Sequence, residues 1–219
     1  KAYWLPKIAA GEARVAVGLE QNLLVEDAHV ADLMLLEKAG ALYAVERSEV
    51  QMVHNASIDL SRKLFSVTFN ETKAVMIADG EEAEALITAA LNRGALSCAA
   101  QALGLTQRMI DLSVQYTTDR TQFGVPIGSF QAVKHRMANV AVALEYAKAT
   151  VHRAAYSVAH NLSTASMNVS HAKLAACDAS LLGAKNSIQV HGAMGYTWEV
   201  DLHIFMKKPY NALKKTRVI

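Results

Sequence analysis

The stretch from Phe130 to Ala154 reads FQAVKHRMANVAVALEYAKATVHRA, and its apolar side chains recur at intervals of seven residues. One series is Phe130, Met137, Leu144 and Val151, and a second begins three residues later with Val133, Val140, Ala147 and Ala154. A seam of this kind, kept over about four heptads, needs another helix packed against it. The spacing therefore predicts a long helix that begins near Gly128 and lies inside a bundle.

Helical patterns continue on both sides of this stretch. Glu81 and Glu82 favour a helix start because acids are stabilised at the positive end of the helix dipole, and the pattern then runs to about Tyr116. A further helix is expected from about Ser166 to Val190, and a shorter one after Tyr196. We therefore expect residues 79–219 to form a bundle of long antiparallel helices, a C-terminal four-helix bundle domain.

The chain before residue 79 has a different period. Short apolar or alternating runs, rich in Val and aromatic residues and separated by turn residues, are typical of strands. They occupy residues 14–19, 32–36, 41–45, 50–53 and 64–69. The sequence thus predicts a small β domain over residues 13–78, and the fold class is mainly α.

Composition excludes several partners. The chain has 219 residues, 52% hydrophobic and 19% charged, and its formal net charge is only +2. So small an excess of positive charge does not favour binding to nucleic acid through the phosphates. No apolar run reaches the roughly 18 residues that a membrane-spanning helix needs. We expect neither nucleic acid nor membrane as a partner.

The cysteines and the first residue lead to two expectations, one about the cellular compartment and one about the length of the chain. Cys98 and Cys177 lack the CxxC spacing of a zinc site and do not form a disulfide framework, so we expect no metal and a reducing, cytoplasmic location. The chain begins with Lys1 in place of Met, which indicates a fragment of a longer protein.

Two segments interrupt the helices and carry residues suited to ligand binding. In Asp119–Ile127, Arg120 offers a planar set of donors to a phosphate, and Phe123 offers an apolar surface to an aromatic ring. In Gln189–Glu199, the glycines allow close approach of a ligand to the backbone. Taken singly, Arg120 serves equally well in a salt bridge that caps a helix, and the glycines serve equally well as helix caps.

Taken together and in this order, the segments resemble the acyl-CoA dehydrogenase family. The resemblance is carried by Arg120–Gly124, Pro126–Gln131 and Gln189–Tyr196, and it covers almost the whole chain. It implies a flavoprotein with an N-terminal helical domain, a middle β domain and a C-terminal four-helix bundle. Residues 1–12, which include Leu5–Glu12, would then be the end of an N-terminal helical domain that is missing here.

In this family the bundle residues reach across a subunit interface to the ADP half of the FAD that the neighbouring subunit holds. Carried over by position, the resemblance implies that the cofactor-binding residues are Arg120, Phe123, Ile127, Phe130, Gln131, Gln189 and Gly192. One departure is Ala193, which replaces the second glycine of a Gly-Gly pair and adds a methyl group where the cofactor would approach.

The chain lacks the family's catalytic base. The α-proton of an acyl-CoA must be removed by a carboxylate, which the family places in one of two positions. One precedes an Arg on the helix after the β domain, and here that position is Asn92, an amide that cannot accept the proton. The other position lies after the segment Gln189–Tyr196, in a region that here spans Met206–Thr216 and contains no acid. We therefore expect no catalytic residue in this chain.

The β domain is also curtailed. The family's loop that lines the flavin ring should follow the strand near Gly18, but Gly18–Leu24 stands there and only Glu20 remains of the pattern. The chain thus resembles the smaller, non-catalytic subunit of the α2β2 acyl-CoA dehydrogenases with which actinobacteria degrade steroids. This resemblance implies a partner subunit that supplies the catalytic Glu and most of the acyl-CoA site, which could take a steroid side-chain CoA ester.

Two alternatives remain open at this point. One is a homotetrameric dehydrogenase with an unrecognised base such as Glu199, although Glu199 and Asp201 are better suited to stabilising a helix start. The other is a scaffold subunit without flavin. The lysines Lys207, Lys208, Lys214 and Lys215 are interpreted as a solvated basic tail.

Overall fold

The computed structural model describes residues 2–21 and 24–214, with side chains up to Lys208. The chain forms two compact units, residues 1–90 and residues 91–219, which are described separately. Part of the predicted loop Gly18–Leu24, namely Asn22 and Leu23, lies outside the described residues, as do Lys1, Lys215 and Thr216. The side chain of Lys214 is also outside this description.

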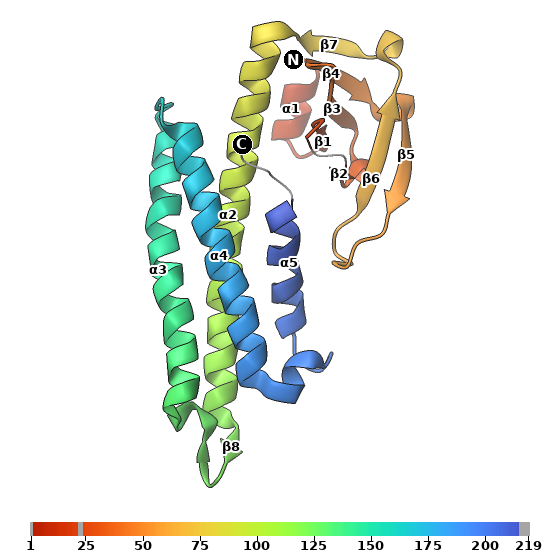
Figure 1. Cartoon of the computed structure of the whole chain (residues 1–219). Helices are drawn as coiled ribbons and strands as arrows, with labels where there is room; N and C mark the ends of the chain where they lie inside the picture. The colour runs from red at the N-terminus through yellow and green to blue at the C-terminus, as the bar shows by residue number, and fades with distance from the viewer. Residues whose placement is uncertain (1, 22–23, 215–219) are drawn as a thin grey trace. The chain divides into compact units, whose positions relative to one another are not determined.

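The first unit begins with a short helix and continues as two small sheets (Figure 1). The helix α1 spans Trp4–Ala9. One sheet has the strand order β1-β3-β4-β7 and the other β2-β6-β5. The strands are β1 Val15–Gly18, β2 Val25–Glu26, β3 Leu33–Lys38, β4 Ala41–Glu46, β5 Val50–Asn55, β6 Leu64–Phe69 and β7 Val75–Ala78.

Apolar side chains that alternate along these strands form the core of this unit. Met34 and Val45 face each other across β3 and β4 and are fully buried. At Gly18 a Cβ atom would lie 2.7 Å from Val25 Cγ2 and 2.8 Å from Leu36 Cδ2, so only glycine lets these residues pack there. The five predicted runs all contain strands, whereas β2 and β7 were not expected from the sequence.

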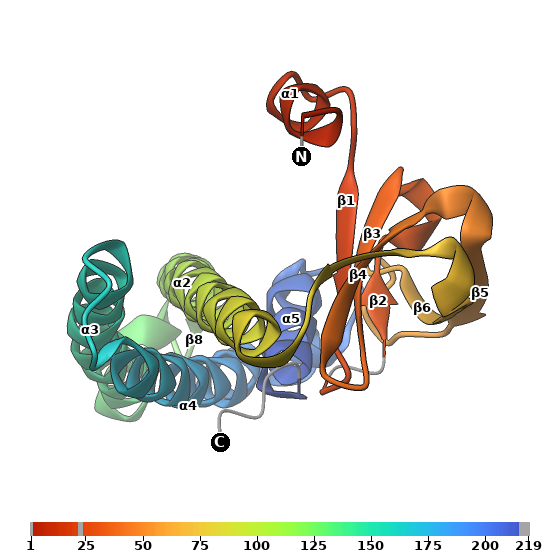
Figure 2. The same ribbon diagram turned by 90° about the horizontal axis from the view of Figure 1, so that it is seen from above.

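The second unit is a helical bundle (Figure 2). Helix α2 spans Gly80–Asp119 and enters this unit at Leu91; three more helices follow it. They are α3 Gln131–Ala159, α4 Ala165–His191 and α5 Leu202–Lys214. Small residues on α4 allow close packing: a Cβ on Gly183 would lie 3.1 Å from Thr106 and 3.4 Å from Met109 and Val140. The mainly α fold class is thus confirmed.

The heptad seam of α3 is confirmed along most of its length. Met137, Val140, Leu144, Ala147, Val151 and Ala154 are all buried. Phe130 was wrongly included, because it stands at the N-cap of α3 and its side chain is 41% exposed. A residue before the first helical turn has non-helical backbone angles, so the seven-residue spacing no longer directs its side chain into the bundle.

Cys177 is buried, Cys98 is half-buried, and both are free thiols. Burial raises the pKa of the Cys177 thiol, so this group stays protonated at neutral pH. Among the residues that the structure describes, no group of three or more His, Cys, Asp or Glu side chains is arranged to hold a metal ion. Within the same residues, no helix is long and apolar enough to cross a membrane.

Candidate functional site

A tight hairpin follows α2 and holds the first two predicted site residues. Its strands are β8 Thr121–Gln122 and β9 Val125–Pro126, and the loop is Phe123–Gly124. Both loop residues have positive φ, 53° for Phe123 and 80° for Gly124, as in a type I′ turn. Asn, Asp and Gly are the usual residues at the first position, so an aromatic side chain there is strained.

Phe123, whose backbone is strained in this turn, is also 92% exposed. Among the side chains that the structure describes, its one ring contact is an edge-on one with Phe130, with ring centroids 6.3 Å apart. The hairpin is tied to the chain that follows it, since the Ile127 N–H donates to the Arg120 carbonyl at 2.9 Å. The Phe123 ring thus presents apolar surface to solvent at the tip of the hairpin.

The second signature, Gln189–Tyr196, lies at the end of α4. The first signature is the segment from Arg120 to Gln131. Gly192 is the C-cap residue, with φ 59° and ψ −134°, a backbone conformation that favours glycine. Gly195 allows the next turn, Gly192–Tyr196, to pack back on α4, because a Cβ there would lie 2.9 Å from the Ile188 carbonyl oxygen. Ala193 has no positive φ, so its methyl group causes no backbone strain. Its effect on a cofactor's approach stays a prediction.

A hollow of about 390 Å³ brings the two signatures together at this end of the bundle. Arg120 of the first signature and His191 of the second both line it. The other lining residues are Leu112, Gln115, Tyr116, Asp119 and Val200. Tyr116 and His191 join the two helices through a stacked ring contact, with centroids 4.4 Å apart. Sequence reasoning missed Tyr116, although it lies only four residues before Arg120, whose N–H donates to the Tyr116 carbonyl at 2.9 Å.

The Arg120 guanidinium is available to a ligand. In residues 2–21 and 24–208, whose side chains the structure describes, no ion pair or side-chain hydrogen bond engages it. Its neighbour Asp119, the obvious salt-bridge partner, instead accepts a hydrogen bond from Gln115 Nε2 at 2.7 Å. The helix-capping salt bridge, which the sequence left open, is therefore not formed here.

All seven predicted cofactor residues lie near the ends of helices in this unit, and most are exposed. Arg120, Phe123, Phe130, Gln131, Gln189 and Gly192 are exposed, and Ile127 is half-buried. Only Arg120 lines the hollow. The other six residues belong to the hairpin, the turn Ile127–Ser129, the start of α3 and the end of α4. We call these seven residues the signature face.

Asn92, the position at which the sequence predicts that the base is absent, is far from the signature face. Asn92 lies on α2, and Arg120 directly follows the end of this helix, 28 residues later, which is about 42 Å along an α-helix. Its Nδ2 donates to Ser166 Oγ at 2.9 Å, so the amide joins α2 to α4. Glu20 has a local role, because its carboxylate accepts a hydrogen bond from the Ala39 N–H in the β3–β4 turn at 2.7 Å.

The predicted basic tail is only partly solvated. Lys208 is exposed, but Lys207 is half-buried with its Nζ 4.1 Å from the centre of the Trp198 ring and 3.4 Å from His203 Nδ1. The tail interpretation is therefore wrong for Lys207, because α5 brings this lysine back onto the loop before it. Glu199 is exposed in that loop.

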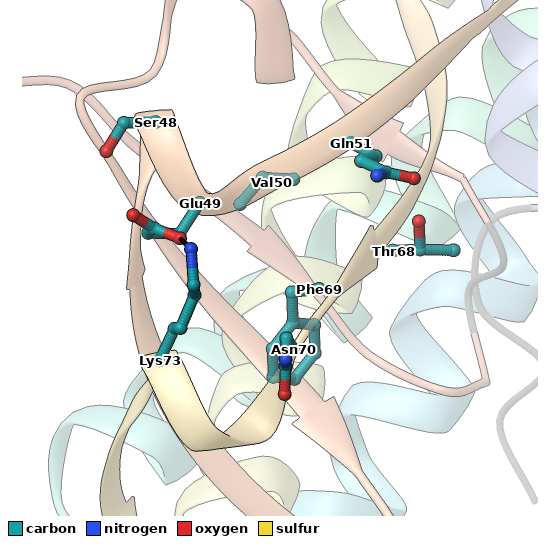
Figure 3. A pocket seen from close by; sticks show the side chains of 8 residues that line it. All are labelled: Ser48, Glu49, Val50, Gln51, Thr68, Phe69, Asn70 and Lys73. Carbon is teal, nitrogen blue, oxygen red and sulfur yellow. Dashed lines mark ion pairs between the residues drawn. The ribbon is translucent and has the colours of Figure 1, made fainter.

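A second hollow, of about 470 Å³, lies in the β unit (Figure 3). It is lined by Ser48, Glu49, Val50, Gln51, Thr68, Phe69, Asn70 and Lys73. Glu49 and Lys73 form an ion pair at 2.8 Å, as the dashed line shows. Because the two charges neutralise each other, the hollow offers no net positive charge to a phosphate, and it contains none of the predicted residues.

Comparison with known proteins gives one family. Residues 84–209 match the model for the C-terminal domain of acyl-CoA dehydrogenases. The chain is 32% identical over 208 residues to the acyl-CoA dehydrogenase IpdE2 of Mycobacterium tuberculosis. That match covers 95% of this chain and 60% of the relative, so the chain spans about three fifths of the length of the relative it matches.

Solved structures share the fold. The ChsE4-ChsE5 complex from Mycobacterium tuberculosis has a chain with a TM-score of 0.77 and 21% identity, covering 96% of this chain and 64% of that one. A variant of the Tcur3481-Tcur3483 steroid acyl-CoA dehydrogenase gives a TM-score of 0.78 and 19% identity, covering 90% of this chain and 56% of that one.

Proposed function

The chain belongs to the acyl-CoA dehydrogenase family, and we propose that it is the non-catalytic subunit of a heteromeric complex of that family. In this proposal a partner subunit supplies the catalytic Glu and most of the acyl-CoA site. This chain supplies the signature face, which holds the ADP half of the FAD seated in the partner. The assembly we propose is an α2β2 heterotetramer.

The observation that carries this proposal is an exposed binding face without internal partners. Arg120 has no ion pair in the part of the chain that the structure describes, and Phe123 keeps a strained backbone with its ring 92% exposed. Strain and exposed aromatic surface both cost stability, and binding to another molecule would offset that cost. Asn92 lies on α2, 28 residues before Arg120, and this separation further supports a face that serves a different site from the one Asn92 would line.

The residues present fit the ADP half of FAD. The unpaired guanidinium of Arg120 suits a pyrophosphate, and the hollow of about 390 Å³ beside it has room for part of a nucleotide. Phe123 and Phe130 offer aromatic surface, and Gly192 offers backbone without a side chain. When bound, FAD would supply hydride acceptance, and the residues of this chain would bind and orient it.

The substrate class we propose is an acyl-CoA thioester, oxidised to the 2-enoyl-CoA, with a steroid-derived acyl group. The relatives' names support the reaction class, since IpdE2 is an acyl-CoA dehydrogenase. The steroid part is supported by a structural neighbour, the Tcur3481-Tcur3483 steroid acyl-CoA dehydrogenase. Competition among acyl-CoA substrates in the assembled complex, with a steroid side-chain ester against a straight-chain ester, tests this step.

Replacing Arg120 by Ala is expected to weaken the hold of the complex on FAD about ten- to hundredfold. Loss of a hydrogen bond to a charged group costs on the order of 1.5–3 kcal/mol, which corresponds to this factor. Assembly should be unchanged, because Arg120 is exposed and makes no ion pair within the described ranges. FAD titration of the apo complex, followed by flavin fluorescence, measures the dissociation constant.

The matched control for Arg120→Ala is Arg136→Ala on α3, which removes an exposed guanidinium that donates to Asn186 Oδ1 at 3.2 Å. This variant should keep the wild-type affinity for FAD. Equal dissociation constants for wild type and Arg120→Ala would remove Arg120 from the cofactor site. A scaffold without flavin predicts no saturable FAD binding at all in any of the three complexes.

Replacing Phe123 by Asn separates two effects: the destabilisation caused by the strained turn and the contribution of the aromatic ring to FAD binding. Asn tolerates positive φ at the first position of a type I′ turn, so the chain should gain up to about 1 kcal/mol of stability. Loss of the aromatic surface should weaken FAD binding about five- to hundredfold, the range for stacking a base on an aromatic side chain. Urea denaturation and FAD titration measure the two effects. Unchanged FAD affinity would show that the exposed ring has no role in cofactor binding.

A further inference from the structure

Helix α4 has apolar side chains on its outer face as well as on its inner one. The inner face packs against α2 and α3, where Ala172 and Ala176 are fully buried. On the opposite face Met167 and Leu174 are exposed, Leu174 by 64%, and Leu181 continues the same seven-residue spacing. The outward face of a bundle helix is normally polar, so the fold of this chain does not require these apolar residues.

The same face carries two opposite charges. Asp178 and Lys185 are both exposed, and their spacing places them on one side of the helix with Leu174. Neither charge belongs to an ion pair among the side chains of residues 2–21 and 24–208. Both charges are therefore available to a second molecule. We call the residues of this face the outward stripe: Met167, Leu174, Asp178, Leu181, Leu182 and Lys185.

The order of residues in the outward stripe is self-complementary. Asp178 precedes Leu181 by three residues, and Lys185 follows Leu182 by three residues. If two copies of α4 lie antiparallel about a two-fold axis between Leu181 and Leu182, Asp178 of each copy faces Lys185 of the other. If the two copies lie parallel and in register, each charge faces its like. The charges thus favour the antiparallel arrangement, and the leucines provide apolar contact at its centre.

We propose that the outward stripe of α4 binds the outward stripe of a second copy of this chain. The two helices are antiparallel, and two ion pairs between Asp178 and Lys185 flank the leucines at the two-fold axis. This inference goes beyond the proposed function, because the contact needs neither flavin nor the partner subunit. One helix face makes a small interface, so we expect a dissociation constant of about 1–100 μM.

Sedimentation equilibrium of the full chain at a series of concentrations tests this contact. Asp178→Lys places lysine against lysine twice in each dimer. It should weaken dimerisation about ten- to hundredfold, because two attractive charge pairs become two repulsive ones. Lys185→Asp should weaken it by a similar factor, since it places aspartate against aspartate. The double variant exchanges the two charges, and it should dimerise within about threefold of wild type because the pairing is restored.

An equimolar mixture of the two single variants should form mixed dimers with about the wild-type affinity, because every charge then faces its opposite. The matched control is Arg153→Asp on α3, which makes the same change of charge as Lys185→Asp at another exposed position. This control should dimerise as wild type does. Circular dichroism of each variant verifies that the helices are intact.

Several results would overturn the proposal. One is a wild-type chain that stays monomeric throughout the micromolar range. Another is dimerisation that neither single variant weakens, because the contact would then lie on another face. A double variant as weak as the single ones would indicate a merely structural effect. If the chain dimerises as expected but its complex holds no FAD, this inference stands and the proposed function fails.

Discussion

The purified chain on its own is expected to leave every acyl-CoA thioester unoxidised, while the co-expressed complex with its partner turns substrate over. The resemblance to the family implies that its base can stand at position 92, where this sequence has the amide Asn92, and Met206–Thr216 contains no acid. A positioned general base contributes about 10²- to 10⁴-fold to such a rate, and a chain without a complete flavin site loses hydride transfer as well. Anaerobic reduction of an artificial electron acceptor, with acyl-CoA as the donor, measures the rate.

Asn92→Glu tests whether a carboxylate at this position is sufficient for activity. A carboxylate at position 92 should not by itself create activity in the isolated chain, because we also expect the chain to lack the flavin-ring loop after Gly18. The matched control is the same substitution in the complex, where the flavin is present. Turnover by a partner-free wild-type preparation would refute the division of labour and support the homotetramer with an unrecognised base. Glu199→Gln would then identify or exclude Glu199 as that base.

The sequence predicted the long elements well because their periodicity is a local property. A seam kept over four heptads identifies α3, and most of its members are buried. The strands of four to six residues were equally readable, except β7, whose residues Val75, Met76 and Ile77 are all exposed and so show no buried alternation. The two-residue strands β2, β8 and β9 are too short to leave a periodic pattern.

The candidate site was less predictable because its residues lie far apart in the sequence and come together only in the folded chain. The resemblance supplied seven residues, but it could not indicate that Tyr116 stacks on His191, which lies 75 positions later in the chain. Nor could it indicate that Asp119 accepts a hydrogen bond from Gln115 and forms no ion pair with Arg120. The left-handed backbone at Phe123 is likewise visible only in the structure, since Phe-Gly is not a usual type I′ sequence.

Leu144→Ala is expected to destabilise the chain by about 2–5 kcal/mol, the range for removing a large apolar side chain from a packed core. Leu144 lies in the middle of α3 and is 1% exposed. Ala is a better helix former than Leu, so helix propensity cannot account for a loss. Urea denaturation followed by far-ultraviolet circular dichroism measures the free energy of unfolding. Met137→Ala, at a position that is 7% exposed, should cost a similar amount.

Val142 provides the matched control for this prediction, because it is an apolar residue on the same helix but is 55% exposed. Val142→Ala should change stability by no more than about 0.5 kcal/mol, as surface substitutions usually do. A loss below about 1 kcal/mol at both Met137 and Leu144 would contradict the burial of the seam. A large loss of stability in Val142→Ala would mean that another subunit covers this face of α3 in solution. The loss should then appear only at protein concentrations where the chain is associated, because a subunit interface stabilises by mass action.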